Sequence, residues 1–160
     1  MAMKFLPLLL FSLVFLTGCN RRGCEFECQN GGSCVDETCE CTADYEGIDC
    51  SKEQRGKFIG AYSVTGTAMC AVSGGPPGII TVSVEASPVS VAHIDLTLLG
   101  VELVAVVNGS TFQIVESELD GFIYTGNGSI SQDTIYFTII ETDLDIPESC
   151  TYTLKGPKQP

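Results

Sequence analysis

The single histidine, His93, is the residue in this chain best suited to acid–base chemistry, because an imidazole titrates near neutral pH. On a strand, its side chain would share a face with those of Asp95 and Thr97. A serine aligned with such a His–Asp pair can act as a nucleophile, but no serine lies in a G-x-S-x-G motif. We therefore interpret His93 as a solvent-facing residue and expect no catalytic residues. We predict that the protein is not an enzyme. A hydrolase is the weaker alternative.

A run of carboxylates around Pro147 is the strongest candidate for a metal site. It consists of Glu141, Asp143, Asp145 and Glu148. Ca²⁺ takes about six to eight oxygen ligands, but this spacing lacks the glycine and the final acid of an EF-hand loop. We expect a solvated acidic loop, with no bound metal and no cofactor.

Three glycine-containing segments have both a functional and a structural interpretation. Gly74–Gly78 reads Gly-Gly-Pro-Pro-Gly, without the lysine or the following helix of a phosphate-binding loop. We expect an exposed loop there, of the kind that often makes contacts. Asn108-Gly109-Ser110 and Asn127-Gly128-Ser129 match the N-glycosylation acceptor pattern, and we interpret both as turns.

The nine cysteines divide into one, six and two along the chain. Cys19 follows a short apolar leader, six cysteines crowd into residues 24–50, and Cys70 and Cys150 stand far apart in the C-terminal region. An odd number of cysteines in an exported chain leaves one thiol to explain. The odd cysteine here is Cys19, at the end of the leader.

The leader predicts export and a lipid anchor. Its apolar run, Phe5–Leu16, is shorter than the roughly 20 residues of a transmembrane helix, which is typical of a signal peptide over residues 1–18. The small pair Thr17-Gly18 directly before Cys19 resembles the lipobox of bacterial lipoproteins. An ordinary secretory leader is the alternative, and it leaves a free thiol at Cys19.

The resemblance to lipoproteins implies that Cys19 carries palmitate-type acyl chains and that residues 19–23 form the lipidated N-terminus. Several acyl chains on one residue hold a protein stably on a bilayer. We therefore expect a chain anchored in the bacterial cell envelope, at the outer membrane.

Residues 24–50 read C-x3-C-x5-C-x4-C-x-C-x8-C. Such a short segment buries too little apolar surface to fold unaided, so covalent staples must hold it. Spacing alone does not choose among the possible pairings, but Gln29–Cys34 places a glycine turn before the third cysteine. Metal binding by these cysteines is the alternative, which an oxidising location disfavours.

The Asn-Gly-Gly-Ser-Cys segment and the terminal Cys-x-Cys-x8-Cys closely resemble an EGF-like domain. The resemblance implies a small two-stranded core and the disulfides Cys24–Cys34, Cys28–Cys39 and Cys41–Cys50. Calcium-binding members have acidic residues before the first cysteine, where this chain has the basic Asn20–Gly23. EGF-like units act as adhesive modules or spacers. Because residues 24–50 lie beside the predicted anchor, we favour a spacer. Residues 51–56 are predicted to be a linker to the next domain.

Residues 57–160 predict an all-β domain. They are rich in Val, Ile, Thr and Tyr, with turn signals about every eight to twelve residues. Apolar residues alternate in segments such as Phe58–Val64 and Ile80–Val84, Val101–Val107 is apolar on both faces, and Asn108-Gly109 is a strong hairpin signal. About eight antiparallel strands fit either an up-and-down β-barrel or a sandwich.

Cys70 lies just after the first predicted strand and Cys150 at the start of the last. If these strands pair antiparallel, the two cysteines lie side by side. We therefore predict a Cys70–Cys150 disulfide, which would also remove a sheet edge.

Two segments of this domain, Lys57–Val64 and Gly126–Ile130, are similar to lipocalin-like small barrels of exported bacterial lipoproteins. Many domains of that kind have no known activity. The formal net charge of −12 argues against nucleic acid as a partner.

The sequence thus favours a non-enzymatic, membrane-anchored envelope lipoprotein, in which an EGF-like spacer presents a β domain to a protein or glycan partner. Aliphatic side chains should fill a barrel of this size. The alternative is a lipocalin-like carrier of a small apolar ligand, with Val101–Val107 lining a cavity. A cavity of at least about 300 Å³ would favour the carrier.

Overall fold

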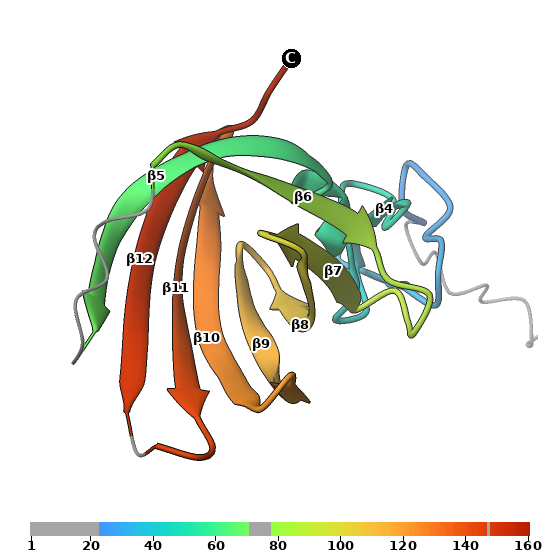
Figure 1. The fold of residues 1–160 in the computed structure, drawn as a ribbon. Helices are drawn as coiled ribbons and strands as arrows, with labels where there is room; N and C mark the ends of the chain where they lie inside the picture. Colours follow the sequence, from blue (N-terminus) through green and yellow to red (C-terminus); the bar gives the residue numbers. More distant parts are fainter. Residues whose placement is uncertain (1–22, 71–77, 147) are drawn as a thin grey trace, which may run out of the picture.

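The computed structural model describes residues 23–70, 78–146 and 148–160. In these ranges the chain forms a cysteine-rich module followed by a closed antiparallel β-barrel (Figure 1). The predicted signal peptide (1–18), the predicted lipid site Cys19 and most of the Gly74–Gly78 loop lie outside the described residues. Within the described part of the chain, no helix has the length and apolarity needed to cross a membrane.

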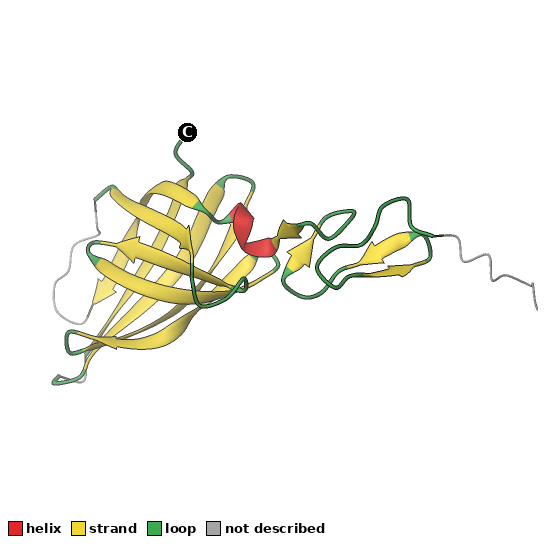
Figure 2. Cartoon of the chain, turned by 90° about the vertical axis from the view of Figure 1, so that its right-hand side faces the viewer, coloured by secondary structure: helices red, strands yellow, loops and turns green. Residues whose placement is uncertain are grey.

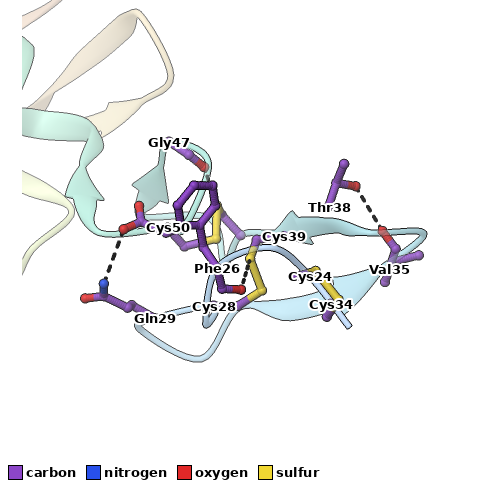
Figure 3. The surroundings of a disulfide bond; sticks show 12 residues. Cys24, Phe26, Cys28, Gln29, Cys34, Val35, Thr38, Cys39, Gly47 and Cys50 are labelled. Carbon is purple, nitrogen blue, oxygen red and sulfur yellow. Dashed lines mark hydrogen bonds between the residues drawn. A yellow bond between two sulfur atoms is a disulfide. The ribbon is translucent and has the colours of Figure 1, made fainter. Parts of the chain in front are cut away.

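The cysteine-rich module consists of two small hairpins held by three disulfides. β1 (Ser33–Val35) pairs with β2 (Thr38–Glu40), and β3 (Tyr45–Glu46) pairs with β4 (Lys52–Glu53). The first two disulfides are drawn in Figure 3. The bonds are Cys24–Cys34, Cys28–Cys39 and Cys41–Cys50, the pairs that the EGF resemblance implies.

Among described residues 23–50, Cys50 is the one fully buried side chain. The module therefore depends on its covalent bonds rather than on an apolar core.

Residues 51–56, expected as a linker, have regular structure. They include β4 and most of the 3₁₀ helix η1 (Gln54–Lys57), which lies between the module and the barrel (Figure 2). On the module side, the Gln54 N–H donates to the Asp44 carbonyl over 2.9 Å, and Lys57 Nζ forms an ion pair with Glu46 Oε2 at 2.7 Å. On the barrel side, Gln54 Oε1 accepts a 2.7 Å hydrogen bond from the Gly109 N–H. The segment thus joins the two parts through contacts on both sides.

Eight strands form the barrel in simple up-and-down order, and the last strand pairs with the first. Closure runs from Cys150 beside Cys70 to Lys155 beside Thr65. The predicted all-β fold with an up-and-down barrel is confirmed, and the sandwich alternative is wrong. The strands are β5 (Gly60–Cys70), β6 (Ile80–Ala86), β7 (His93–Leu98), β8 (Val101–Asn108), β9 (Thr111–Leu119), β10 (Phe122–Ser131), β11 (Thr134–Asp143) and β12 (Ser149–Pro157).

Alternation along each strand separates the core from the surface, since successive side chains point to opposite faces. In β8, Leu103, Ala105 and Val107 are buried inside the barrel, whereas Val106 is 39% exposed outside. Val101–Val107 is apolar on both faces because the outer face of β8 also carries valines, Val104 and Val106.

The two ends of the barrel differ. The closed end carries η1, the connection 87–92 and the turns 109–110 and 132–133. Here the Arg55 guanidinium donates to the carbonyls of Ser87, Ser90 and His93 over 2.9 to 3.3 Å. Phe58 follows η1, is fully buried and packs edge-to-face on Phe112, with ring centroids 5.6 Å apart. The open end carries the described connections 99–100 and 120–121 and the described residues 144–146 and 148 between β11 and β12.

Asn127-Gly128-Ser129 is not a turn, and this expectation is wrong. The three residues lie in the middle of β10, whereas Asn108-Gly109 does form the β8–β9 turn, with φ of 61° at Gly109. Glycines inside β10 allow neighbouring strands to approach closely. A Cβ at Gly126 would overlap the Thr138 carbonyl oxygen, and one at Gly128 would overlap the Phe112 ring. Glycine at these positions therefore allows β10 to pack closely against its neighbouring strands where the barrel wall curves.

Candidate functional site

The interior of the barrel contains a cavity of about 250 Å³ that lies toward the open end and is partly open to solvent. The aromatic rings of Phe58, Phe112 and Phe137 occupy the other end of the interior. Aliphatic side chains make up most of the cavity wall, because inward positions of six strands converge on it. The lining residues are Ile80, Leu98, Leu99, Val101, Leu103, Tyr124, Ile139, Glu141, Tyr152 and Leu154.

Three polar side chains interrupt this apolar wall: Glu141 on β11, Tyr124 on β10 and Tyr152 on β12. Tyr124 is the direct cross-strand neighbour of Glu141. Burial raises the pKa of Tyr124 to about 12, with further contributions from the charge of Glu141 and from a hydrogen bond to it. Burial and the Glu141 charge also raise the pKa of Tyr152. Both phenols therefore stay protonated at neutral pH and can donate hydrogen bonds beside a carboxylate.

These shifts predict that stability decreases in alkali. Burial and the nearby Asp133 also raise the pKa of Tyr62, whose hydroxyl donates to the Phe58 carbonyl over 2.7 Å, to about 12. The unfolded chain loses these protons near pH 10, before the folded chain does. The contribution to folding is therefore complete below about pH 10 and disappears as the pH rises toward 12. We expect the phenolate absorbance of the folded protein to lag behind that of the denatured protein in a pH titration, and Tyr124→Phe to remove part of the lag. Coincident titration curves would contradict this prediction.

Exposed apolar side chains surround the open end. They come from the end of β5, from the start of β6 and from the connections after β7 and β11. Met69 is 75% exposed, Ile79 78%, Leu99 73%, Leu144 46% and Ile146 53%. Leu99 also lines the cavity, so the apolar surface continues from the rim into the interior. An apolar surface that extends from the rim into the cavity is suited to contact with an apolar molecule.

Three residues of the acidic run, Glu141, Asp143 and Glu148, line a small depression of about 110 Å³ beside the Cys70–Cys150 disulfide. Glu141 faces the cavity, whereas Asp143 Oδ1 accepts hydrogen bonds from the N–H groups of Asp145 (2.8 Å) and Ile146 (3.1 Å), which shapes the connection. Among the described residues, these acids do not bring three carboxylate oxygens within 4.8 Å of one another. The sulfur atoms of Cys24, Cys28 and Cys39 do approach this closely, but all three belong to disulfides.

His93 lies at the closed end, away from the cavity. Its Nδ1 is 2.6 Å from Ser90 Oγ, and this oxygen also accepts a 3.2 Å hydrogen bond from the Ala92 N–H. Asp95 follows on the same strand face, where its Oδ1 is buried without a hydrogen-bond partner among the described residues. The Ser90 hydroxyl thus bonds to the backbone of a local turn and to the His93 ring, so Ser90 and His93 have a structural role in this turn.

A second depression, a shallow groove of about 610 Å³, lies mainly on the outer side of β5 and β10–β12. It is larger than the cavity but open to solvent. Hydroxyl and amide groups from Thr67, Asn127, Ser129 and Thr138 line it, together with Tyr136, which is 43% exposed. A groove this open to solvent offers a ligand little desolvation, so we regard the cavity inside the barrel as the better candidate site.

Comparison with known proteins finds no matching protein family, curated protein or solved structure. Reasoning from the sequence named Val101–Val107 as a cavity wall, and Val101 and Leu103 do line the cavity. It missed Tyr124, Glu141 and Tyr152 as a group. The available signal was a tyrosine or a carboxylate at the second inward position from the same end of each of three consecutive strands.

Proposed function

We propose that this chain is a binding protein whose barrel holds a small, mainly apolar molecule at its open end. The observation that supports this proposal is the 250 Å³ cavity, with aliphatic walls and a few polar groups that converge on it. Ligand sites have this composition. The volume of about 250 Å³ is below the roughly 300 Å³ expected of a carrier, so the cavity suits only a small ligand. Because a cavity of roughly 150 Å³ holds benzene, we infer a ligand of about eight to ten non-hydrogen atoms.

The proposal extends to the rest of the chain. Cys19 would carry the lipid anchor, and the EGF-like module would act as a spacer between the membrane and the barrel. The contacts of η1 with both parts support a stiff spacer, because Gln54 bonds to the module and to the barrel. In this arrangement the chain is an envelope lipoprotein without catalytic activity, at the outer membrane.

Titration with cyclohexylmethanol, a neutral molecule of suitable size, tests the binding function. We expect the chain from residue 19, made soluble by Cys19→Ser, to bind it with one-to-one stoichiometry. At about 0.5 kcal/mol per non-hydrogen atom, its Kd should be on the order of 1 mM. Backbone amide shifts in NMR spectra should map to the lining strands at the open end.

Leu103→Phe and Val106→Phe provide a matched pair of variants on β8. Leu103 lines the cavity, whereas Val106 points outward. Leu103→Phe should fill the cavity and abolish binding, and Val106→Phe should leave the Kd unchanged. Equal binding by both variants, or none by the parent chain, would exclude the cavity as the binding site.

The outer groove supports a second candidate, binding of a glycan. Tyr136 presents an exposed aromatic ring among hydroxyl and amide groups, and such a surface can stack on a sugar and hydrogen-bond its hydroxyls. In the same NMR experiment with soluble oligosaccharides, shifts centred on Asn127 and Tyr136 would favour this function over the first.

A further inference from the structure

Glu141 is the one carboxylate in the cavity wall. It follows the inward residues Ile135, Phe137 and Ile139 of β11 by strict alternation, so its side chain points to the same interior. The side chain of Glu141 is partly exposed, so a ligand in the cavity can reach its carboxylate. Tyr124, its cross-strand neighbour, has no positive charge that could neutralise a carboxylate.

No basic side chain of the described residues is available at the open end. Its connections carry acids, including Asp120, Asp145 and Glu148, and no lysine or arginine. The described basic residues lie in the module, in η1 and toward the other end of β12; they are Lys52, Arg55, Lys57, Lys155 and Lys158. The entrance therefore has a negative potential, which attracts cations and repels anions.

The aromatic neighbours of Glu141 also favour a cation. Tyr124 and Tyr152 line the cavity on the two strands that flank β11. A tyrosine hydroxyl oxygen can accept a hydrogen bond from an ammonium group. A carboxylate flanked by two such hydroxyls can accept the N–H donors of the ammonium group together with them.

We propose that the ligand of this cavity is a small apolar amine, bound as its ammonium ion. The nitrogen lies at Glu141 between Tyr124 and Tyr152, and the apolar part lies among Leu98, Leu103 and Leu154. This inference rests on the proposed function and adds the chemical class of the ligand. It accounts for an inward carboxylate that has no basic partner among the described residues.

Comparison of three ligands of one shape tests the inference without altering the site. Cyclohexylmethylamine, cyclohexylmethanol and cyclohexanecarboxylate share their apolar part and differ in charge. On the soluble Cys19→Ser chain, we expect calorimetry to show the amine binding at least about tenfold more tightly than the alcohol, and the carboxylate binding more weakly than both. Equal Kd values for the amine and the alcohol would overturn the inference and leave the proposed function standing. Absence of binding by every ligand would overturn both.

Two variants assign the effect to Glu141. Glu141→Gln removes the charge and keeps the shape, so the preference for the amine over the alcohol should fall to within about twofold while the alcohol still binds, which also shows that the variant is folded. Glu102→Gln is the matched control, since Glu102 is exposed on β8 between the lining residues Val101 and Leu103. It should keep the preference. If both variants keep it, Glu141 does not hold the ammonium group and the inference is wrong.

Discussion

Replacing Phe58 by alanine should lower the free energy of unfolding of the barrel by about 4 kcal/mol, since removal of a buried phenylalanine typically costs about 3 to 5 kcal/mol. Phe58 is fully buried at the closed end, its ring packs on Phe112, and its carbonyl accepts the Tyr62 hydroxyl. The closed end has little freedom to collapse into the space, because Arg55 is bonded to three carbonyls directly beside it. Urea unfolding followed by far-ultraviolet circular dichroism measures the change.

Tyr136→Ala is the control for this change. It removes an aromatic side chain from the same barrel, but one that is 43% exposed on β11. Its cost should stay within about 1 kcal/mol. Similar unfolding midpoints for Phe58→Ala and Tyr136→Ala would show that Phe58 is not part of the cooperative core.

Removal of the Cys70–Cys150 disulfide should have an effect of the same size. The bond joins β5 to β12 across a sequence separation of 80 residues. A cross-link over a loop of this length restricts the unfolded chain by about 4 kcal/mol on the chain-entropy estimate. Without it, the β5–β12 ladder alone closes the barrel at the open end, and two strand edges are exposed when that ladder opens. We expect the Cys70→Ser/Cys150→Ser double variant to unfold at a clearly lower urea concentration.

The cysteine-rich module supplies the control for the disulfide experiment. Cys24→Ser/Cys34→Ser removes a bond with a sequence separation of 10 outside the barrel, so the barrel transition should keep its midpoint. If the Cys70→Ser/Cys150→Ser variant also keeps the parent midpoint, the strand pairing alone is sufficient for closure.

Much of the barrel could be predicted because its signals are local. Alternation in Ile80–Val84 reports which face of a strand is buried, and Asn108-Gly109 supplies the positive φ that a tight turn needs. Local sequence does not determine the structure at Gly128. The same Asn-Gly-Ser triplet is a turn at Asn108 and the interior of a strand at Asn127, because the second glycine is required by the Phe112 ring on a neighbouring strand. Similarly, Phe58 continues an alternating pattern but lies after η1, before the first barrel strand begins at Gly60.

The sequence by itself determined the all-β class, the approximate number of strands, and the positions where cysteines occur in pairable groups. These properties depend on the alternation of apolar side chains, on the residues at turns and on the spacing of cysteines, all of which can be seen in short stretches of sequence. Only the tertiary structure decided that a cavity remains at the open end, and that Tyr124, Glu141 and Tyr152 meet there. Their meeting depends on the register between strands, such as Tyr124 beside Glu141 and Cys150 beside Cys70, and on how the barrel closes. Register is a property of paired backbones, and it brings together residues that no local pattern connects.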